Sequence, residues 1–436
     1  MNSKTTLQLL RDYESRNVTF LDPDGSWPIV WERAKGVHVW DAKGRRYLDL
    51  TAAFGVANAG HANPRVVRAA QQQAAKLLHA MGDVHPHALK AQLARELSRI
   101  TFERWSRSSR IAGKTIFCNS GFEAVEAALK TALLVTGRTG VIAFEGAYHG
   151  TGYGALNATH RAHFREPFRR QLAEFATFVP FPEAKNDLPA LEKQLTAILR
   201  KKKTGAILVE PVQGRAGIRV PPPAFLRLLR RLCDRHGTLL IADEIYTGFG
   251  RTGLWFACEH SGVTPDLICL GKALTGGFPL SACVGRADLM DAAWPASTGE
   301  AIHTSTFLGH PVGCAMALAQ IAELRHLRLP ERSARLGKRL IENLRHLTKL
   351  DLPLHIGVRG LGLMVGVEVR LADGSPATDL VLAAVKRMLR YHTIFLPEGP
   401  HSNVISLTPP LTISEDQLRT AAMAIAFALA ALTEPQ

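Results

Sequence analysis

A single lysine, Lys272, stands at the end of an apolar run in the segment DLICLGKALTGGFPL, residues 266–280. A pair of glycines follows it, in a loop that a ligand could approach closely. Lysine is rarely buried, and an isolated lysine at the end of a strand is usually solvated. In a desolvated pocket, however, its pKa falls and the neutral amine can form an imine with an aldehyde. Lys272 is therefore a candidate for covalent attachment of an aldehyde.

Two carboxylates, Asp243 and Glu244, directly follow the apolar segment TLLIA. A charge at such a place is costly unless it has a partner. A ring nitrogen that must stay protonated would be one, because an adjacent carboxylate raises its pKa. Gly248, Gly250 and Gly253 then follow with the GxGxxG spacing of dinucleotide-binding loops. The acidic pair precedes them and LWFACEHSG is a poor opening helix, so a nicotinamide enzyme is disfavoured.

Two further strand ends carry groups that could hold a ligand. In FCNSGFEAVEAALK, Ser120 and Glu123 have the spacing of a capping box, and Gly121 leaves the first helical amides accessible. Such a helix start can bind phosphate, although an ordinary capped helix has the same pattern. In FEGAYHGTGYGAL, Tyr148 and His149 lie between glycines and could offer an aromatic face to a flat ligand, or simply pack.

Together these groups fit one ligand, which has a phosphate, a flat ring, a protonated ring nitrogen and an aldehyde. Pyridoxal 5'-phosphate has all four, and a lysine imine with an acidic partner for the pyridinium is its usual protein environment. We therefore predict this cofactor, and no metal.

These groups must be positioned by strands that alternate with helices. Short apolar runs that end in polar or glycine-bearing turns predict strands in KTIFCNS, GVIAFEG, GAILVEP, TLLIADE and DLICLGK. Helical patterns lie between several of them, for example EAVEAALKTALLVTG and PAFLRLLRRLCDRHG. This alternation predicts an α/β domain with a mostly parallel central sheet. Ligands of such sheets bind outside the carboxyl ends of the strands, where all the groups above fall.

The two ends of the chain have a different texture. GVHVWDAKGRRYLDL predicts two strands joined by a turn, and the C-terminal part has charged helices, the strand NVISLTPPL and a closing helix. We expect a large cofactor-binding domain over residues 51–318. A smaller α+β domain is expected from an N-terminal segment, 1–50, and a C-terminal part, 319–436.

Composition limits the class of protein. A chain of 436 residues, 46% of them hydrophobic, can bury a large core. The net charge of +15 is attributed to solvated helix faces such as ERSARLGKRLIENLRH, so no nucleic-acid partner is expected. The six cysteines lack CxxC spacing, the N-terminus is charged, and AAMAIAFALAAL is too short to span a bilayer. A cytoplasmic protein without a membrane partner is predicted.

Six motifs occur in a fixed order over nearly the whole chain: SGFEAVEAALK, AYHG, VEPVQG, ADEIYTGFGRTG, LGKALTGGFPL and STFLGHP. The chain thereby resembles the class III aminotransferases, which include ornithine, acetylornithine and 4-aminobutyrate aminotransferases and the ω-transaminases. The resemblance implies the fold type I architecture and a homodimer with active sites at the subunit interface. It leaves open whether dimers pair into tetramers.

The resemblance also implies roles for single residues. Lys272 would form the internal aldimine, Asp243 would pair with the pyridine nitrogen, and Tyr148 would stack on the ring; these three are the predicted catalytic residues. Ile245 would pack under the ring, and Thr306 would reach the phosphate of the neighbouring subunit's cofactor. The predicted cofactor contacts beyond the three catalytic residues are Ser120, Gly121, Phe122 (through its backbone), His149, Glu210, Ile245, Tyr246 and Thr306.

In the implied reaction a substrate amine displaces Lys272, and the freed lysine moves a proton from the amine-bearing carbon to the cofactor. A carbonyl product and pyridoxamine phosphate result, and a 2-oxo acid reverses the steps. The amine is expected to be a terminal one. Amino-acid racemases, epimerases and aminomutases of the same fold are the alternative.

One departure from the family concerns the substrate. The ornithine and 4-aminobutyrate branch has a carboxylate-binding arginine three residues before the PPL turn, where this chain has Ser406. Serine cannot replace a guanidinium fork, so both pyruvate and 2-oxoglutarate remain candidate acceptors. Glu210, which often pairs with that arginine, is expected either to face an ammonium group of the substrate or to pair with Arg215. Glu210, Arg215 and Ser406 are the predicted substrate-binding residues.

Overall fold

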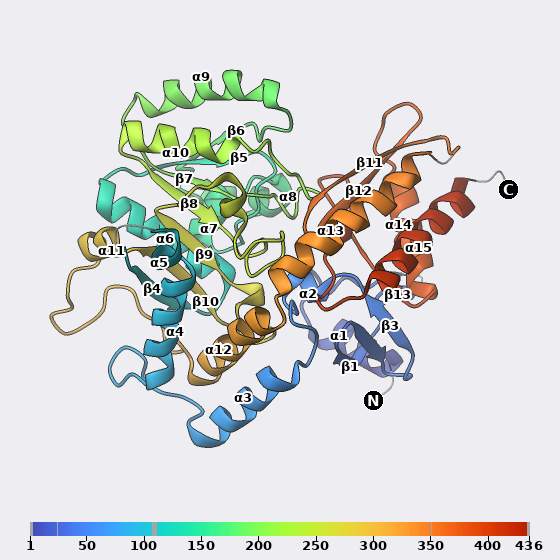
Figure 1. Ribbon diagram of the computed structural model, residues 1–436, viewed down its shortest axis with the longest axis horizontal. Helices are drawn as coiled ribbons and strands as arrows, with labels where there is room; N and C mark the ends of the chain where they lie inside the picture. Colours follow the sequence, from blue (N-terminus) through green and yellow to red (C-terminus); the bar gives the residue numbers. More distant parts are fainter. Residues whose placement is uncertain (1–2, 24, 107–110, 350, 434–436) are drawn as a thin grey trace.

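The computed structural model describes residues 3–23, 25–106, 111–349 and 351–433 (Figure 1). A seven-stranded sheet forms its centre. The strands lie in the order β4 (Gly113–Cys118), β10 (Ser281–Arg286), β9 (Leu267–Leu270), β8 (Leu239–Asp243), β7 (Thr204–Val209), β5 (Gly140–Phe144) and β6 (Ala176–Val179). The last five run parallel, and β10 is antiparallel to both its neighbours. The five strands expected from the sequence are all present.

Helices cover both faces of this sheet, because its central strands are apolar on both sides. Ala206 and Leu208 of β7 belong to the same buried cluster as residues of α6 (Gly121–Thr136) and α11 (Ala287–Ala293). The alternate residues Ile207 and Val209 belong to the cluster that contains α9 (Leu188–Leu199) and α10 (Phe225–His236). Continuous apolar strands between two helical layers are typical of parallel sheets. The α/β prediction is confirmed.

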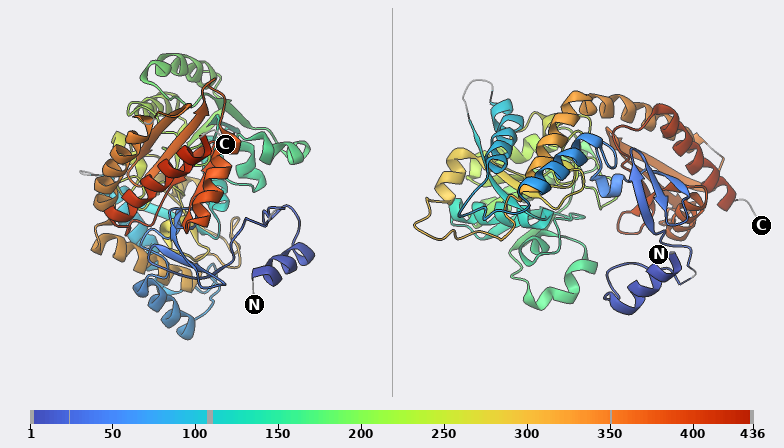
Figure 2. Two further views of the ribbon diagram at one scale, coloured as in Figure 1. Left: turned by 90° about the vertical axis from the view of Figure 1, so that its right-hand side faces the viewer. Right: turned by 90° about the horizontal axis from the view of Figure 1, so that it is seen from below.

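Two four-stranded sheets form the other part of the molecule, beside which both described chain ends lie (Figures 1 and 2). The first has the order β1 (Trp31–Lys35), β2 (His38–Asp41), β3 (Arg46–Asp49) and β13 (Thr393–Ile394). Its β3–β13 pairing joins the two ends of the chain in one sheet. The second has the order β11 (Leu354–Leu361), β12 (Met364–Leu371), β15 (Val404–Leu407) and β14 (Leu396–Glu398).

Three long helices accompany these sheets: α13 (Leu329–Arg345), α14 (Thr378–Arg390) and α15 (Glu415–Thr433). In α13 the expected apolar face is buried, at Leu336, Leu340 and Leu344. The closing helix α15 is buried on one face only, since Met423 and Phe427 are exposed. No helix within the described ranges is long and apolar enough to cross a membrane.

The remaining α-helices have between 4 and 16 residues. They are α1 (Ser3–Tyr13), α2 (Ala52–Gly55), α3 (Pro64–Lys76), α4 (Ala88–Ile100), α5 (Phe102–Trp105), α7 (Tyr153–Ala158), α8 (Ala162–Arg165) and α12 (Pro311–His326). Single turns of 3-10 helix cover Glu166–Gln171, Lys185–Asp187, Ala257–Ser261, Lys272–Leu274 and His346–Lys349. The expected domain boundary at 318/319 lies inside α12, and the division into domains stays a prediction.

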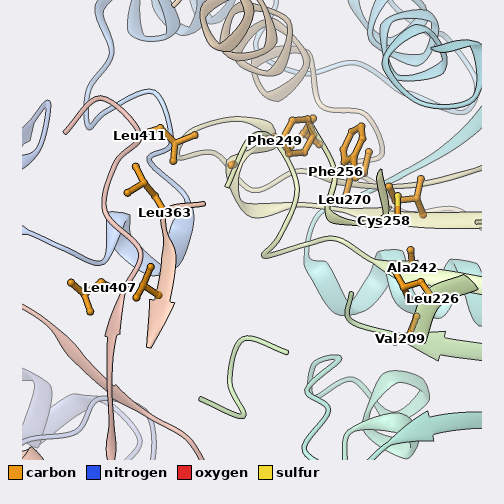
Figure 3. Packing of buried hydrophobic residues seen from close by; sticks show 14 of the residues in the cluster. Val209, Leu226, Ala242, Phe249, Phe256, Cys258, Leu270, Leu363, Leu407 and Leu411 are labelled. Carbon is orange, nitrogen blue, oxygen red and sulfur yellow. The ribbon is translucent and has the colours of Figure 1, made fainter. Parts of the chain in front are cut away.

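One hydrophobic cluster continues from the central sheet into the second four-stranded sheet (Figure 3). Phe249 and Phe256 lie between Leu270 of β9 on one side and Leu363 and Leu411 on the other. Close packing of this kind transmits position from one element to the next. Side chains of the second four-stranded sheet are therefore held at fixed places relative to the strand ends of the central seven-stranded sheet.

Candidate active site

The polar groups singled out in the sequence meet where the parallel strands end. Lys272 follows β9, Asp243 ends β8, Glu210 follows β7, and Tyr148 lies in the loop after β5. All four line one cavity of about 240 Å³. The cavity is bounded by Gly121, Phe122, Tyr148, His149, Gly150, Thr151, Glu210, Arg215, Asp243, Ile245, Tyr246 and Lys272. The sheet thus gathers these groups because the carboxyl ends of parallel strands share one edge.

Lys272 is the nucleophile candidate of this cavity. Its backbone φ is +35°, which is uncommon for a residue with a side chain and is typical of constrained functional positions. Its Nζ lies 4.7 Å from the centre of the Tyr246 ring. Loss of water around the amine lowers the pKa of Lys272, and the charges of Asp243 and Glu210 oppose this shift. A larger neutral fraction makes the amine a better nucleophile.

Asp243 is almost completely buried, and two neighbouring groups form hydrogen bonds with its carboxylate. His149 Nδ1 lies 2.7 Å from Asp243 Oδ2, and the amide of Ile245 donates to Oδ1 over 3.1 Å. An ionised carboxylate can only accept hydrogen bonds, so His149 donates from Nδ1. The remaining lone pairs of Asp243 can accept a hydrogen bond from a protonated ring nitrogen in the cavity. His149 thus orients Asp243, which is predicted to pair with the pyridine nitrogen of the cofactor.

The N-terminus of α6 is suited to a phosphate. The Glu123 carboxylate accepts the amides of Asn119 (2.6 Å) and Ser120 (3.3 Å), which fixes the entry to the helix. The Ser120 hydroxyl is buried and has no hydrogen bond of normal geometry to any described residue. A Cβ at Gly121 would lie 3.1 Å from Ile245, so glycine keeps the approach open. An unpartnered hydroxyl beside a helix N-terminus fits a phosphate group.

Glu210 and Arg215 do not pair with each other. Glu210 accepts hydrogen bonds from the backbone amides of Tyr148 and Gly214, and both N–O distances are 3.0 Å. Burial raises the pKa of Glu210 to about 6. Arg215 forms its ion pair with Glu398, Nε to Oε2 3.2 Å, and its guanidinium lies 5.3 Å from the Tyr148 ring centre. The expectation that Arg215 supplies the counter-charge of Glu210 is therefore wrong, because Glu398 already occupies that place.

Three predicted contacts lie apart from this cavity or at its edge. Ser406 is buried in β15 between Gly366 and Leu396 of the neighbouring strands, and it is not among the residues that bound the cavity. Its contact with substrate stays a prediction. Thr306 is exposed outside the cavity of its own chain. Ser120 lies at the cavity edge, beside Gly121.

Glu398, Gly150 and Thr151 were not predicted from the sequence. Gly150 ends the AYHG motif and Thr151 follows it, so the motif itself was the signal. Glu398 gave no such signal. It ends the short strand β14, far along the chain from Arg215, and only the packing of two sheets brings the two together.

Comparison with known proteins gives the same assignment. Residues 21–429 match the family model described as aminotransferase class-III. The chain belongs to the class III aminotransferases. The family is dependent on pyridoxal phosphate and has the fold type I architecture, so the predicted cofactor, enzyme class and fold are confirmed.

Individual relatives agree with this membership. The acetylornithine aminotransferase of Methanopyrus kandleri is 40% identical over 93% of this chain and 95% of its own. The 5-aminovalerate aminotransferase of Pseudomonas aeruginosa is 38% identical over 90% of this chain and 91% of its own. An amine transaminase of an uncultivated Pseudomonas species, solved in its PLP-bound form, is 29% identical with a TM-score of 0.84 over 97% and 98% of the two chains. These relatives give no support to the racemase, epimerase or mutase alternative.

Proposed function

We propose that this aminotransferase takes the terminal amino group of an amine or amino acid and transfers it to a 2-oxo acid, pyruvate or 2-oxoglutarate. The observation that carries the proposal is the meeting of Lys272, Asp243 and Glu210 in one cavity. The name of the Pseudomonas aeruginosa relative, 5-aminovalerate aminotransferase, supports a donor with its amine at the end of a chain.

When bound, the cofactor supplies an aldehyde and a ring that takes up negative charge. The chain's own residues would do the rest. The Ser120 hydroxyl and the first amides of α6 would hold the phosphate. Asp243, oriented by His149, would keep a proton on the ring nitrogen. Lys272, with its lowered pKa, would accept the proton from the amine-bearing carbon of the substrate and pass it to the cofactor.

The cavity's acidic groups favour a donor that arrives as an ammonium ion. Glu210, which lines the cavity, is ionised above about pH 6, and the amides of Tyr148 and Gly214 hold its two oxygens in place. A fixed carboxylate attracts a cation more strongly in a site shielded from water. We infer that Glu210 faces an ammonium group of the donor.

We also infer that the enzyme acts as a cytoplasmic homodimer. Leu78, Met81 and Val84 are exposed beside the exposed Ile302 and Phe307. The two segments lie together, as the ring contact of His79 with Phe307 (5.3 Å) shows. An exposed apolar patch of this kind usually marks a protein interface, and Thr306 lies within it. The cysteines are all free and buried, as is usual in a reducing compartment.

The test is a titration of the purified holoenzyme with a panel of amines in the absence of a 2-oxo acid. We expect the visible band of the bound cofactor to disappear while a carbonyl product forms. Pyruvate or 2-oxoglutarate should then restore the band, which identifies both substrates. Turnover of an amino acid while the band persists would contradict the proposal and favour a racemase or mutase.

A further inference from the structure

Arg215 stands between two cavities. It is the one arginine among the described residues that bound the cofactor cavity, where Lys272 is the other basic side chain apart from His149. It also borders a second cavity of about 290 Å³, together with Trp27, Phe54 and Glu398. Arg215 is thus a boundary residue of both spaces.

The ion pair of Arg215 with Glu398 leaves most of the arginine's hydrogen-bonding capacity unused. The pair joins Nε to Oε2 over 3.2 Å, but Arg215 Nε makes no hydrogen bond of normal geometry with any described residue. A guanidinium can hold a carboxylate through two parallel hydrogen bonds, which is its strongest arrangement. Arg215 keeps 35% of its side chain exposed, whereas Glu398 keeps 5%. The arginine is therefore the accessible member of the pair.

Two guanidinium groups lie near the Glu398 carboxylate. Arg161, whose guanidinium lies 5.4 Å from the Phe164 ring centre, acts on Glu398 together with Arg215. Burial raises the pKa of Glu398 to about 7, and Arg215, Arg161 and Lys272 oppose the shift while Glu210 adds to it. Two guanidinium groups thus share one carboxylate that can also become neutral. A carboxylate that enters beside Glu398 would be attracted by both guanidinium groups.

We propose that Arg215 binds the carboxylate of the 2-oxo acid acceptor, and that Glu398 is its counter-ion when no acceptor is bound. Arg215 would then bind the carboxylate that related enzymes bind with an arginine at the position of Ser406, which is buried in β15 here. The acceptor carboxylate would take the free N–H groups of Arg215 while its carbonyl points to the cavity of Lys272. This assignment rests on the proposed transamination and names the residue that selects its acceptor.

The first experiment measures binding without turnover. Propanoate and glutarate match pyruvate and 2-oxoglutarate but lack the reacting carbonyl. Calorimetric titration of the holoenzyme should show that Arg215→Gln raises the Kd of these acids about tenfold, which is the usual effect of losing a charged hydrogen bond. Glu398→Gln should lower the Kd severalfold, because it removes the competing carboxylate. This opposite change also tests the proposal if Arg215→Gln does not fold.

The matched control is Lys386→Gln, which removes a basic side chain that borders the second cavity and is not among the residues that bound the cofactor cavity. We expect its Kd for both acids to stay within about twofold of the wild type. If Lys386→Gln weakens binding as much as Arg215→Gln, or if both the Arg215 and Glu398 variants bind as the wild type does, the proposal is wrong.

The second experiment separates this proposal from the proposed function. The two half-reactions are followed singly, with a monoamine that has no carboxylate and then with pyruvate added to enzyme loaded with pyridoxamine phosphate. If the wild type performs neither half-reaction, the proposed function fails. If it performs both, Arg215→Gln should impair the pyruvate half-reaction about tenfold more than the amine half-reaction. Equal impairment of both would show a merely structural role.

Discussion

The two ends of the active site are built in different ways. At the cofactor end, Lys272 follows β9 and Asp243 ends β8, the neighbouring strand of the same sheet. A backbone amide and His149 hold Asp243 in place. At the substrate end, Arg215 belongs to the loop after β7 and meets Glu398, which ends β14 in another sheet. The first end is fixed by buried main chain, and the second by one imperfectly aligned ion pair.

This contrast separates reaction type from substrate choice. Groups that stabilise a reacting centre act best when they need no rearrangement during the reaction, and buried strand ends provide that. Groups that recognise substrate must release one partner to accept another, which a partly exposed guanidinium with a replaceable counter-ion allows. Loss of Lys272 or Asp243 at the cofactor end should therefore abolish the reaction, whereas changes at the substrate end should redirect it.

The largest expected effect is that of Lys272→Ala. Loss of the proton-transferring amine should lower turnover by about 10⁴-fold or more, since general acid–base catalysis alone contributes about 10²–10⁴-fold. Steady-state rates and the visible absorption of the bound cofactor measure it. Arg215→Gln is the comparison, because its loss should depend on the acceptor. Full activity of Lys272→Ala would remove the distinction between the two ends.

An intermediate effect is expected from pH. The pKa of Glu398 is raised to about 7, so the side chain is neutral below that pH and an ionised competitor for Arg215 above it. The KM for the acceptor should therefore rise severalfold from about pH 6 to about pH 8 in the wild type. In Glu398→Gln, the KM for the acceptor should stay constant over the same pH range. Both enzymes are measured with saturating amine. A parallel rise in the variant would mean that another group titrates.

The smallest effect is expected at the phosphate. Ser120→Ala removes a buried hydroxyl that makes no hydrogen bond of normal geometry with any described residue, so it should weaken cofactor binding by about 1 kcal/mol, or roughly fivefold. The free energy of unfolding of the apoprotein should hardly change. Cofactor titration and denaturant unfolding measure the two quantities. A large loss of apoprotein stability would show that the hydroxyl serves the fold rather than the cofactor.

Much of the cofactor end could be predicted from local patterns. The apolar runs before Ser120, Asp243 and Lys272 mark strands, and a polar residue after each run marks its carboxyl end. The support of Asp243 by His149 was not predicted as a pair, although both residues were named. Two side chains from different loops meet only when the strand order is known, and periodicity does not encode that order.

The sequence by itself determined the family, through six motifs in a fixed order, and with the family the cofactor. It also predicted the reacting residues, because short-range hydrophobic patterns mark where strands end and parallel strands present those ends at one edge. Only the tertiary structure decided which charges meet at the substrate end. Pairing of Arg215 with the nearby Glu210 was one of two alternatives, but Glu210 accepts two backbone amides and Arg215 pairs with Glu398. That choice depends on how one sheet packs against another, a long-range contact for which the chain carries no local signal.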